Sequence, residues 1–328
     1  MRPYIHAITA RDRVRFGSYM TTLLLTHPAC LDHLTPEGHP ERPDRLRAIN
    51  QVLADERFNA LMRAEAPEGN LDAVMLCHNE HYVTELRHVA PKSGMVYVDG
   101  DTSMSPGTWE AVMRGVGGAV AATDAVMSGA HHNAFVAVRP PGHHAEKSTP
   151  MGFCFFDNAA IAARHAQRKH GIARAAVIDF DVHHGNGTQD IFWADKSVMY
   201  CSTHQMPLFP GTGARGERGD HDTIVNAPLA PEDGSAKFRA AFENLILPQL
   251  QKFSPELLII SAGFDAHHRD PLASINLKGE DFGWVTRKLM DVADKSAEGR
   301  VVSVLEGGYD LEGLKESVAS HVTALMGA

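Results

Sequence analysis

The sequence predicts a single-domain α/β protein, in which a mainly parallel sheet is covered by helices on both faces. Short runs of β-favouring residues alternate with amphipathic stretches, the pattern of strands connected by helices. The candidate strands are apolar throughout, which is typical of strands that are buried on both faces. No Pro- or Ser-rich linker divides the 328 residues, so residues 20–328 are expected to fold as one unit.

Six segments are expected to form strands of this sheet. Each is a short run rich in Val, Ile, Leu or Ala, and most are followed by polar residues or by Gly or Pro. In chain order they are Thr22–Thr26, Ala134–Val138, Ala175–Asp179, Val198–Ser202, Leu257–Ser261 and Val301–Leu305.

Capping residues mark the helices between these strands. Ser105, which a proline follows, is typical of an N-cap, and Gly129 would end the helix that begins there. Gly171 would end a second helix at about Asn158–His170. Pro248 predicts a kink or a break in the next helix. The remaining helices are expected at about Ser235–Phe253, Glu280–Ser296 and Leu311–Leu325.

The charge and the cysteines exclude several classes of function. The formal net charge is −9, from 31 Lys and Arg against 40 Asp and Glu. A general nucleic-acid binder would show a basic surface, so no direct nucleic-acid partner is expected, whereas a cationic substrate stays open. The four cysteines are far apart and form no CxxC pair. Neither a disulfide framework nor a cysteine zinc cluster is expected, and a reducing cytoplasm is the predicted location.

The N-terminal residues 1–19 differ in character from the chain that follows. They are polar and basic and lack the apolar core of a signal peptide. No stretch approaches 18 apolar residues, so neither a transmembrane helix nor a membrane partner is expected. We interpret residues 1–19 as a flexible extension or as the product of a start codon placed too early, with an ordinary surface-packed leader as the alternative.

Polar clusters follow four of the expected strands at the point where each strand ends. The clusters are Arg139–His144, Asp179–Asn186, Ser261–Asp265 and Glu306–Tyr309. In open α/β sheets, ligands bind in the crevice outside the carboxyl ends of the strands. We therefore expect the four clusters to converge at one edge of the sheet and to form one site.

Three residues in these clusters have the chemistry of a metal site. Asp181 and His183 lie two residues apart at a strand end, where their side chains can point the same way. Together with Asp265 they would give two carboxylates and one imidazole, leaving a position open for water or substrate, as in catalytic zinc sites. Iron(II) or another divalent ion would also fit this ligand set. The alternative is that the aspartates cap helices and that the histidine is a satisfied core residue.

The adjacent imidazoles of His143 and His144 suit general acid/base catalysis beside such a metal. Each would need a partner that orients its ring, and Asp179 and Asn186 could serve, one for each histidine. Because an aspartate raises the basicity of a histidine more than a neutral asparagine does, the two histidines need not be equivalent. The alternative is a His-His pair that merely closes a loop, and other such pairs occur in this chain.

Tyr309 follows two glycines, which leave room for its side chain to turn inward. Its phenol could donate a hydrogen bond to a developing oxyanion, although a tyrosine packed at a helix start is the alternative. A metal, paired imidazoles and an oxyanion donor together indicate metal-assisted hydrolysis of an amide or an ester. The chain has neither a phosphate-binding glycine loop nor a Gly-x-Ser-x-Gly motif, which argues against nucleotide-dependent and serine-hydrolase chemistry.

The motifs together resemble the histone deacetylase superfamily, in order and over more than nine tenths of the chain. The resemblance is carried by Arg139–His144, Gly152–Phe153, Asp179–Gly187, Phe209–Gly213, Ala262–Asp265 and Glu306–Tyr309. His39–Pro43 and Asn186 resemble the class II branch, which includes bacterial histone deacetylase-like amidohydrolases. The resemblance implies the arginase/deacetylase fold, a single domain with an eight-stranded, mainly parallel sheet.

The resemblance also implies a role for each candidate residue. It implies Zn²⁺ held by Asp181, His183 and Asp265, with Fe²⁺ as an alternative in the cell. It implies His143 and His144 as the acid/base pair, backed by Asp179 and Asn186, and Tyr309 as the group that polarises the substrate carbonyl. It implies a tunnel for an acyl-lysine stem lined by Gly152, Phe153 and Phe209, with Leu272 and Gly307 as further substrate-binding positions. It finally implies structural K⁺ beside the zinc segment, near Asp179, Asp181, His183 and Ser202.

Two positions refine the expected substrate. Some relatives that hydrolyse acetylpolyamines carry an acidic residue at the position of Leu272, so an apolar residue there favours acyl-lysine in a peptide or protein. Some relatives carry His at the position of Tyr309, a change that weakens turnover of acetyl-lysine, so an active deacetylase is expected here. The alternatives are an amidohydrolase of acetylpolyamines or other small N-acyl amines and, more remotely, a silent acyl-lysine binding module. Some relatives assemble through loops around the site, which leaves a homo-oligomer open.

Overall fold

The computed structural model describes residues 21–328, so the extension predicted at residues 1–19 lies outside the described residues. Its centre is an eight-stranded parallel sheet in the order β2-β1-β5-β10-β9-β6-β7-β8. The strands are β1 (Thr22–Thr26), β2 (Met62–Glu65), β5 (Asn133–Val136), β6 (Ala175–Asp179), β7 (Val198–Gln205), β8 (Ile224–Leu229), β9 (Leu257–Ala262) and β10 (Val301–Leu305). Two short strands, β3 (Val96–Tyr97) and β4 (Ser103–Met104), form a separate antiparallel pair.

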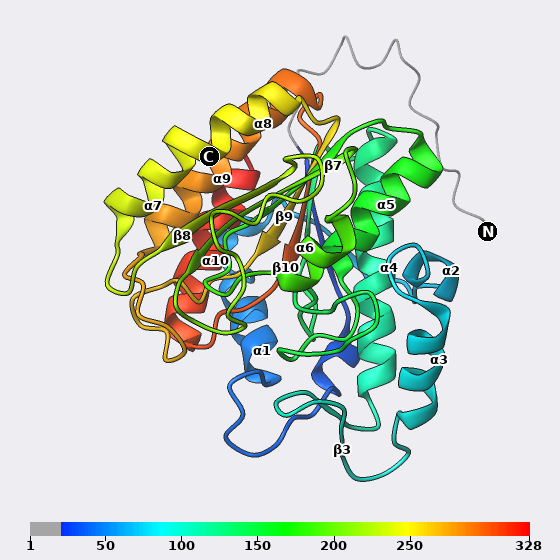
Figure 1. The fold of residues 1–328 in the computed structure, drawn as a ribbon. Coiled ribbons are helices and arrows are strands. Elements are labelled where there is room, and N and C mark those ends of the chain that lie inside the picture. Colours follow the sequence, from blue (N-terminus) through cyan, green and yellow to red (C-terminus); the bar gives the residue numbers. More distant parts are fainter. Residues whose placement is uncertain (1–20) are drawn as a thin grey trace, which may run out of the picture.

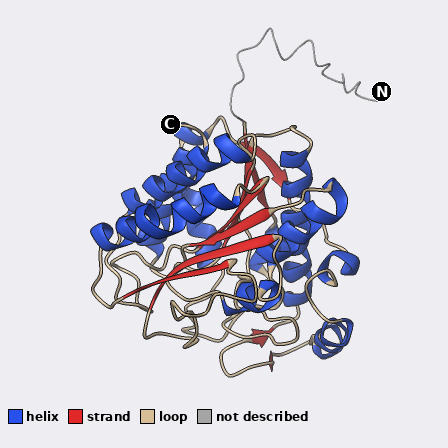
Figure 2. Ribbon diagram, turned by 45° about the horizontal axis from the view of Figure 1, so that its top comes forward, coloured by secondary structure: helices blue, strands red, loops and turns tan. Residues whose placement is uncertain are grey.

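Helices cover both faces of the sheet, as predicted (Figures 1 and 2). They are α1 (Asp44–Val52), α2 (Leu71–Val74), α3 (Glu80–Val89), α4 (Thr108–Met127), α5 (Asn158–His170), α6 (Asn186–Phe192), α7 (Ser235–Ala241), α8 (Leu247–Phe253), α9 (Gly279–Ser296) and α10 (Leu311–Leu325). Helices α4 and α5 pack together on one face, whereas α9 and α10 pack together on the other, with α1 against α10. No helix among residues 21–328 is long and apolar enough to cross a membrane.

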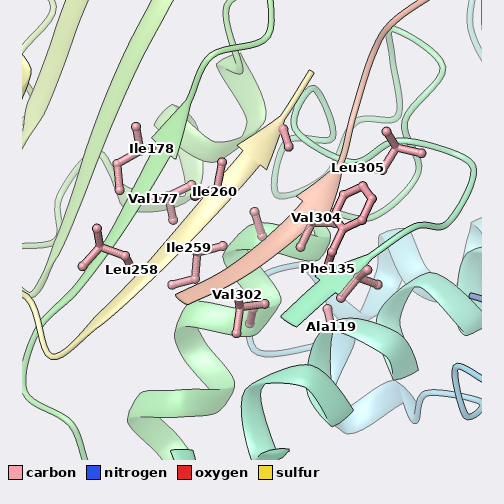
Figure 3. Close-up of a cluster of buried hydrophobic side chains, with 14 of the residues drawn as sticks. Ala119, Phe135, Val177, Ile178, Leu258, Ile259, Ile260, Val302, Val304 and Leu305 are labelled. Carbon is pink, nitrogen blue, oxygen red and sulfur yellow. The ribbon is translucent and has the colours of Figure 1, made fainter. Parts of the chain in front are cut away.

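The core lies on both sides of the central strands (Figure 3). Ile178, Ile259, Ile260 and Val302 are fully buried, although neighbouring side chains in a strand point to opposite faces. Burying an aliphatic side chain of this size stabilises the fold by about 1.5–3 kcal/mol. The continuous apolar runs in the sequence therefore reflect a sheet that is covered on two sides.

The sequence predicted some boundaries closely and others less well. The bounds of β1, β6, β10, α5 and α10 are those predicted. The strand predicted at Ala134–Val138 is displaced toward the N-terminus, and β7 and β9 continue beyond their predicted ends.

The prediction that Ser105 caps a helix is wrong. Helix α4 begins at Thr108 and its N-cap is Gly107. The Ser105 hydroxyl instead accepts the amide of Leu34 (2.9 Å), so a tertiary contact occupies the oxygen that would have capped the helix. The predicted end is confirmed, because Gly129 directly follows the C-cap with a φ of 72°.

The stretch from Ser235 to Phe253 is divided, as Pro248 predicted. A π-helical turn at Phe242–Ile246 separates α7 from α8, and Pro248 lies in the first turn of α8. A proline has no amide hydrogen to bond the carbonyl one turn earlier, so a regular α-helix cannot run through this point.

Two strands of the eight-stranded sheet were not predicted from the sequence, and both lie at its edges. The residues of β2 are all exposed and its sequence is MRAE, so neither hydrophobicity nor alternation marks it. Strand β8 contains Asn226 and Pro228, and a proline is tolerated in a sheet only where one side of the strand is unpaired. Edge strands carry weak sequence signals because only one neighbour holds them in place.

His321 leads to a prediction about acid stability. It is fully buried in α10, with Nδ1 2.6 Å from the Thr286 hydroxyl and Nε2 2.9 Å from the Ser303 hydroxyl. Burial lowers the pKa of His321 to about 3. The folded state therefore binds this proton less readily than the unfolded state, whose histidine has a pKa near 6.5. The stabilisation is complete above pH 6.5 and is lost as the pH falls towards 3, by about 1.4 kcal/mol per pH unit once the unfolded histidine is protonated.

Urea unfolding of the wild type and of His321→Gln between pH 6 and pH 4 tests this expectation. As the pH falls, the free energy of unfolding of the variant should decrease less steeply than that of the wild type, by about 1.4 kcal/mol per pH unit. This difference in slope does not depend on the variant's stability at neutral pH. Equal slopes for the two proteins would show that His321 does not couple folding to protons.

Candidate active site

The four predicted clusters meet at one edge of the sheet. They follow the carboxyl ends of β5, β6, β9 and β10, which are neighbours in the strand order β5-β10-β9-β6. The parallel register brings the end of β6 beside that of β9, where Asp179 lies opposite Ser261. The convergence predicted from the sequence is therefore confirmed.

Asp181, His183 and Asp265 form a compact, buried group. One potential ligand atom from each lies within 4.8 Å of those of the other two. The Nδ1 atom of His183 is 3.2 Å from Oδ1 of Asp181 and 3.0 Å from Oδ2 of Asp265. The geometry brings together the three residues that the sequence singled out, with an imidazole nitrogen and two carboxylate oxygens facing one point.

The helix-cap alternative for the two aspartates is wrong. The N-cap of α6, the helix that follows Asp181, is Gly185. No helix begins after Asp265 until α9, whose N-cap is Lys278. One oxygen of Asp181 accepts the Gly307 amide (2.8 Å) and one oxygen of Asp265 accepts the Val182 amide (2.8 Å). These backbone donors fix the two carboxylates, and each retains an oxygen directed at His183.

The ionisable side chains of this group shift one another's pKa values. Although burial opposes it, the two carboxylates raise the pKa of His183 to about 10. Burial and the neighbouring Asp181 carboxylate raise the pKa of Asp265 to about 7. Although burial opposes this shift too, His143 and His183 keep the pKa of Asp181 below its usual range. Two buried carboxylates beside one imidazole are a favourable place for a divalent cation, which would neutralise both.

Small residues surround the carboxylates where a larger side chain would not fit. A Cβ atom at position 263 would collide with the Asp181 carboxylate, and one at position 307 with the Asp265 carboxylate. Gly263 and Gly307 thus let two loops approach the acidic group closely. Gly307, which the sequence placed among the substrate-binding residues, lies against the carboxylates and is not among the residues that line the cavity described below.

His143 is paired with a carboxylate. Its Nδ1 atom is 2.9 Å from Oδ2 of Asp179, and its Nε2 atom is 3.8 Å from Oδ1 of Asp181. Burial alone would lower the pKa of His143, but these two carboxylates raise it well above the usual value. The arrangement favours an imidazolium at this position, which is a proton donor.

His144 has a neutral partner. Asn186 donates from Nδ2 to Glu146 (2.8 Å), so its Oδ1 atom is the one that faces Nδ1 of His144, at 2.8 Å. The oxygen accepts the Nδ1 proton and leaves a lone pair on Nε2. Burial, together with His143 and His183, lowers the pKa of His144 well below the usual value. The two rings, 4.0 Å apart between centroids, are thus held in different protonation states.

Tyr309 lies at the same site and is nearly buried, at 8% exposure. Its backbone amide donates to Oδ2 of Asp270 (2.7 Å), and the guanidinium of Arg45 lies 4.8 Å from the centre of its ring. Burial raises the pKa of Tyr309, so the phenol keeps its proton and stays a hydrogen-bond donor.

A cavity of about 260 Å³ opens onto this group. Its walls combine aromatic and aliphatic side chains with the imidazoles and the phenol. It is lined by Asp101, His144, Gly152, Phe153, His183, Leu208, Phe209, Leu272 and Tyr309. Four predicted substrate-binding positions are therefore in the wall: Gly152, Phe153, Phe209 and Leu272.

The segment Gly152–Phe153 has a backbone shape that brings it close to the histidines. Gly152 has a φ of 56°, and a Cβ atom there would collide with the ring of His144. Phe153 has a φ of 69°, and its amide donates to the Thr102 hydroxyl (3.0 Å). The Gly152 amide donates to Asp101 (3.2 Å). Loop 101–102 thus stabilises a left-handed backbone that a phenylalanine rarely adopts.

A buried network of ion pairs holds the loops together, and nothing in the sequence indicated how its residues pair. The Arg139 guanidinium donates to both oxygens of Glu41, at 2.5 and 2.7 Å. Arg45 also donates to Glu41 (3.2 Å) and to the carbonyls of Glu306 and Gly308, at 2.5 and 2.6 Å. All three charged side chains have no exposed surface. They join the helix α1 region to the loops that carry the histidine pair and Tyr309.

Two further acidic residues hold the loops of the site by accepting hydrogen bonds from backbone amides. Glu306 accepts the amides of Gly142 (2.7 Å) and His143 (3.1 Å). Asp270 accepts the amides of Leu272 (3.1 Å) and Tyr309. Burial raises the pKa of Glu306 to about 8 and that of Asp270 to about 6. The acidic residue in the Glu-Gly-Gly-Tyr motif was visible in the sequence, but nothing there indicated that its carboxylate binds a distant loop.

Ser202 and Asp179, the residues expected near potassium, lie opposite each other on neighbouring strands. The Ser202 hydroxyl is 2.8 Å from Nδ1 of His204. Both side chains are fully buried. The two residues thus lie together, and the potassium site itself stays a prediction.

Comparison with known proteins shows the family to which the chain belongs. A sequence profile of the histone deacetylase domain matches residues 39–325. A probable deacetylase of Archaeoglobus fulgidus is 37% identical over 90% of this chain and 83% of its own length. A histone deacetylase-like amidohydrolase of Pseudomonas aeruginosa is 37% identical over 83% of this chain and 73% of its own length. The crystal structure of the HDA15 HD domain superposes with a TM-score of 0.90 and 34% identity, covering 94% of this chain and 89% of that one. The chain therefore belongs to the histone deacetylase family, with its fold, and is a hydrolase of the deacetylase type.

Proposed function

We propose that the protein is a zinc-dependent amidohydrolase that removes acetyl or short acyl groups from the side-chain amine of acyl-lysine in peptides or proteins. The observation that carries this proposal is the position of the His143–His144 pair and Tyr309 around the group of Asp181, His183 and Asp265. Family membership supports the reaction type, and the lining of the cavity supports the substrate.

The metal would be held by Asp181, His183 and Asp265. Two carboxylate oxygens and one imidazole nitrogen match the three protein ligands of catalytic zinc, and Fe²⁺ would accept the same donors. When bound, the cation supplies a Lewis acid that polarises the acyl carbonyl and makes water more acidic. The two buried carboxylates beside His183 and the close glycines at positions 263 and 307 support this assignment.

The histidines would divide the proton transfers between them. His144, with a free Nε2 lone pair and a lowered pKa, would take the proton from the attacking water. His143, paired with Asp179 and with a raised pKa, would donate a proton to the lysine amine as the C–N bond breaks. Attack forms a C–O bond and a tetrahedral oxyanion, and collapse of that oxyanion releases the amine and the carboxylate.

Tyr309 would donate its phenolic hydrogen to the oxyanion. No hydrogen bond from its hydroxyl to another residue among 21–328 is found, so the donor is available to a substrate. Asp270 accepts the backbone amide of Tyr309, and the guanidinium of Arg45 lies over the face of its ring. Such preorganised donors act on the transition state without reorganisation during the reaction.

Replacing Asp265 with alanine should remove the metal. Two of three ligands would remain, and the hydrogen bond to the Val182 amide would be lost. After dialysis against metal-free buffer, we expect wild-type protein to retain one zinc per chain and Asp265→Ala to retain much less than one, with no measurable deacetylation.

Asp157→Asn is the matched control. Asp157 is equally buried but caps α5 through the Ala160 amide (2.8 Å), a role that asparagine also fills. This control should keep its zinc. Full zinc occupancy in Asp265→Ala would contradict the assignment of Asp265 as a ligand.

Leu272 would set the preference for acyl-lysine. Its side chain lines the cavity and offers no counter-charge to the second ammonium of an acetylpolyamine. We expect Leu272→Glu to raise kcat/KM for acetylspermidine relative to an acetyl-lysine peptide by roughly tenfold, which corresponds to about 1.4 kcal/mol. Leu272→Gln, of the same size but neutral, should leave the ratio near that of the wild type. The same ratio in both variants would exclude a charge effect at this position.

A second candidate is hydrolysis of acetylpolyamines or other small N-acyl amines by the same chemistry. The acidic side chain of Asp101 lines the cavity and favours this candidate, because it could face an ammonium group. Its Oδ1 atom, however, accepts the Gly152 amide and the Thr102 hydroxyl (2.9 Å), which partly satisfies its charge.

A further inference from the structure

A second group of metal-ligand side chains lies on the surface between α4 and α5, away from the cavity. Asp124 comes from α4, and His165 and His170 come from α5. Nε2 of His165 is 2.8 Å from Oδ1 of Asp124, and Nε2 of His170 is 2.7 Å from the same oxygen. Figure 1 shows the two helices packed side by side, and the three residues lie toward the C-terminal ends of both.

The group is partly buried and its side chains are held in place. The side chains of Asp124, His165 and His170 are 32%, 13% and 20% exposed, so each is reached by solvent but is not free to move widely. The centroids of the two imidazole rings are 6.0 Å apart. The only other group of this kind among residues 21–328 is the proposed catalytic metal site.

The donor atoms suit a borderline divalent cation. Two imidazole nitrogens and one carboxylate oxygen form a common protein ligand set for zinc and for nickel or cobalt, with further positions left to water. No hydrogen bond to the Nδ1 atom of either histidine is found among the described residues. Without a metal, each Nε2 donates its proton to Asp124; when a cation binds, each ring can carry its proton on Nδ1 and offer the Nε2 lone pair to the metal.

Without a metal, positive side chains satisfy Asp124. Lys169 donates to its second oxygen, Oδ2, at 2.6 Å. The Nε2 atoms of His165 and His170 both contact the other oxygen, Oδ1, so three basic side chains surround this carboxylate. The carboxylate thus lies where a cation is favoured.

We propose that Asp124, His165 and His170 form a second divalent-metal site, which binds Zn²⁺ or a similar cation and clamps α4 to α5. Lys169 is the competing cation, because its ammonium neutralises the carboxylate that the metal would use. Because the ligands come from two helices, binding requires the folded packing of α4 against α5. A ligand that binds only the folded protein raises the free energy of unfolding, and the increase grows with the logarithm of the free ligand concentration.

The test is a zinc titration of protein that already holds one zinc per chain. Calorimetry should show a second equivalent of zinc, and the unfolding temperature should rise as zinc is added beyond the first equivalent. His165→Gln and His170→Gln should each weaken the second equivalent by tenfold or more, because glutamine keeps a polar side chain but lacks the imidazole nitrogen. Lys169→Gln should tighten it, because the competing charge is gone.

His88→Gln is the matched control, since His88 is exposed on α3 and belongs to no metal-ligand group found among residues 21–328. It should bind the second zinc as the wild type does. Unfolding in the presence of a chelator shows whether each variant is folded before zinc is added. In the titration, Asp265→Ala should lack the first equivalent and still bind the second once zinc is in excess, although dialysis against metal-free buffer removes this second zinc from both proteins. This result separates the site from the proposed catalytic one.

Three results would overturn the proposal. The first is a single zinc per wild-type chain at saturation. Another is undiminished binding of the second zinc to both histidine variants, which would place that zinc at a different site. The third is equal weakening in Lys169→Gln and the histidine variants, which would make the group an ion-pair cluster and not a metal site.

Discussion

Replacing His144 with glutamine is expected to lower kcat for an acetyl-lysine peptide by roughly 10²–10⁴-fold, the usual contribution of a positioned general base. Glutamine can still interact with Asn186 but has no lone pair that accepts a proton at neutral pH. The substrate should still bind, because the cavity wall keeps its aromatic rings. Steady-state kinetics at several substrate concentrations would separate the fall in kcat from any change in KM.

The roles of the two histidines can be separated with a second substrate. An activated aryl ester, whose phenolate leaves without protonation, needs no general acid, but its hydrolysis still needs the general base. We therefore expect the ester to restore most of the lost rate in His143→Gln and little of it in His144→Gln. Equal restoration in both variants would show that the different partners, Asp179 and Asn186, do not assign different roles to the two rings.

Replacing Tyr309 with phenylalanine is expected to lower kcat by roughly 10²–10³-fold, as the loss of one oxyanion donor does elsewhere. The ring would still pack against Phe153, 5.9 Å away, and beneath the guanidinium of Arg45. The variant removes one hydroxyl and leaves the group of Asp181, His183 and Asp265 intact. Zinc content measured beside kcat would show that the loss comes from the phenol and not from the metal.

Tyr97→Phe provides the control for this substitution. Tyr97 is 62% exposed and lies on β3, outside the cavity, so its hydroxyl should be dispensable. If Tyr309→Phe turned over substrate as fast as Tyr97→Phe, the phenol of Tyr309 would have no role in the mechanism.

The site could be predicted from the sequence because its residues follow a simple rule of sheet geometry. Parallel strands end at the same edge, so the positions of Asp181, Asp265 and Tyr309 directly after strands are enough to place them together. The pairing of His143 with Asp179 and of His144 with Asn186 was also anticipated. Asp179 ends β6 and Asn186 begins α6, so both partners lie on one short segment, which limits the geometries that they can adopt.

A pair of adjacent histidines does not by itself identify the site in the sequence. His267 and His268 also form close rings, with centroids 4.3 Å apart, but they lie outside the cavity. Nε2 of His267 instead approaches Glu316, at 3.5 Å. What distinguishes His143 and His144 is their place in the loop that follows the central strand β5, opposite a segment with the acidic residues Asp179 and Asp181.

The contacts that the sequence did not reveal join residues that are far apart in the chain. Glu41 and Arg139 are 98 positions apart, and Arg45 binds carbonyls more than 260 positions away. Neither periodicity nor spacing carries such information, because each contact depends on how several loops pack at once. The group of Asp124, His165 and His170 was missed for the same reason, since its carboxylate lies 41 positions before the first histidine.

The proposal that this deacetylase-family site acts on acyl-lysine in peptides or proteins is open to one direct comparison. We would measure kcat/KM of the zinc-loaded protein on an acetyl-lysine peptide beside acetylputrescine and acetylspermidine. We expect a preference for the peptide of tenfold or more, which is about 1.4 kcal/mol of transition-state discrimination. Faster hydrolysis of either acetylated polyamine would contradict the proposed substrate, and no hydrolysis of any of the three by zinc-loaded protein would contradict the proposed activity.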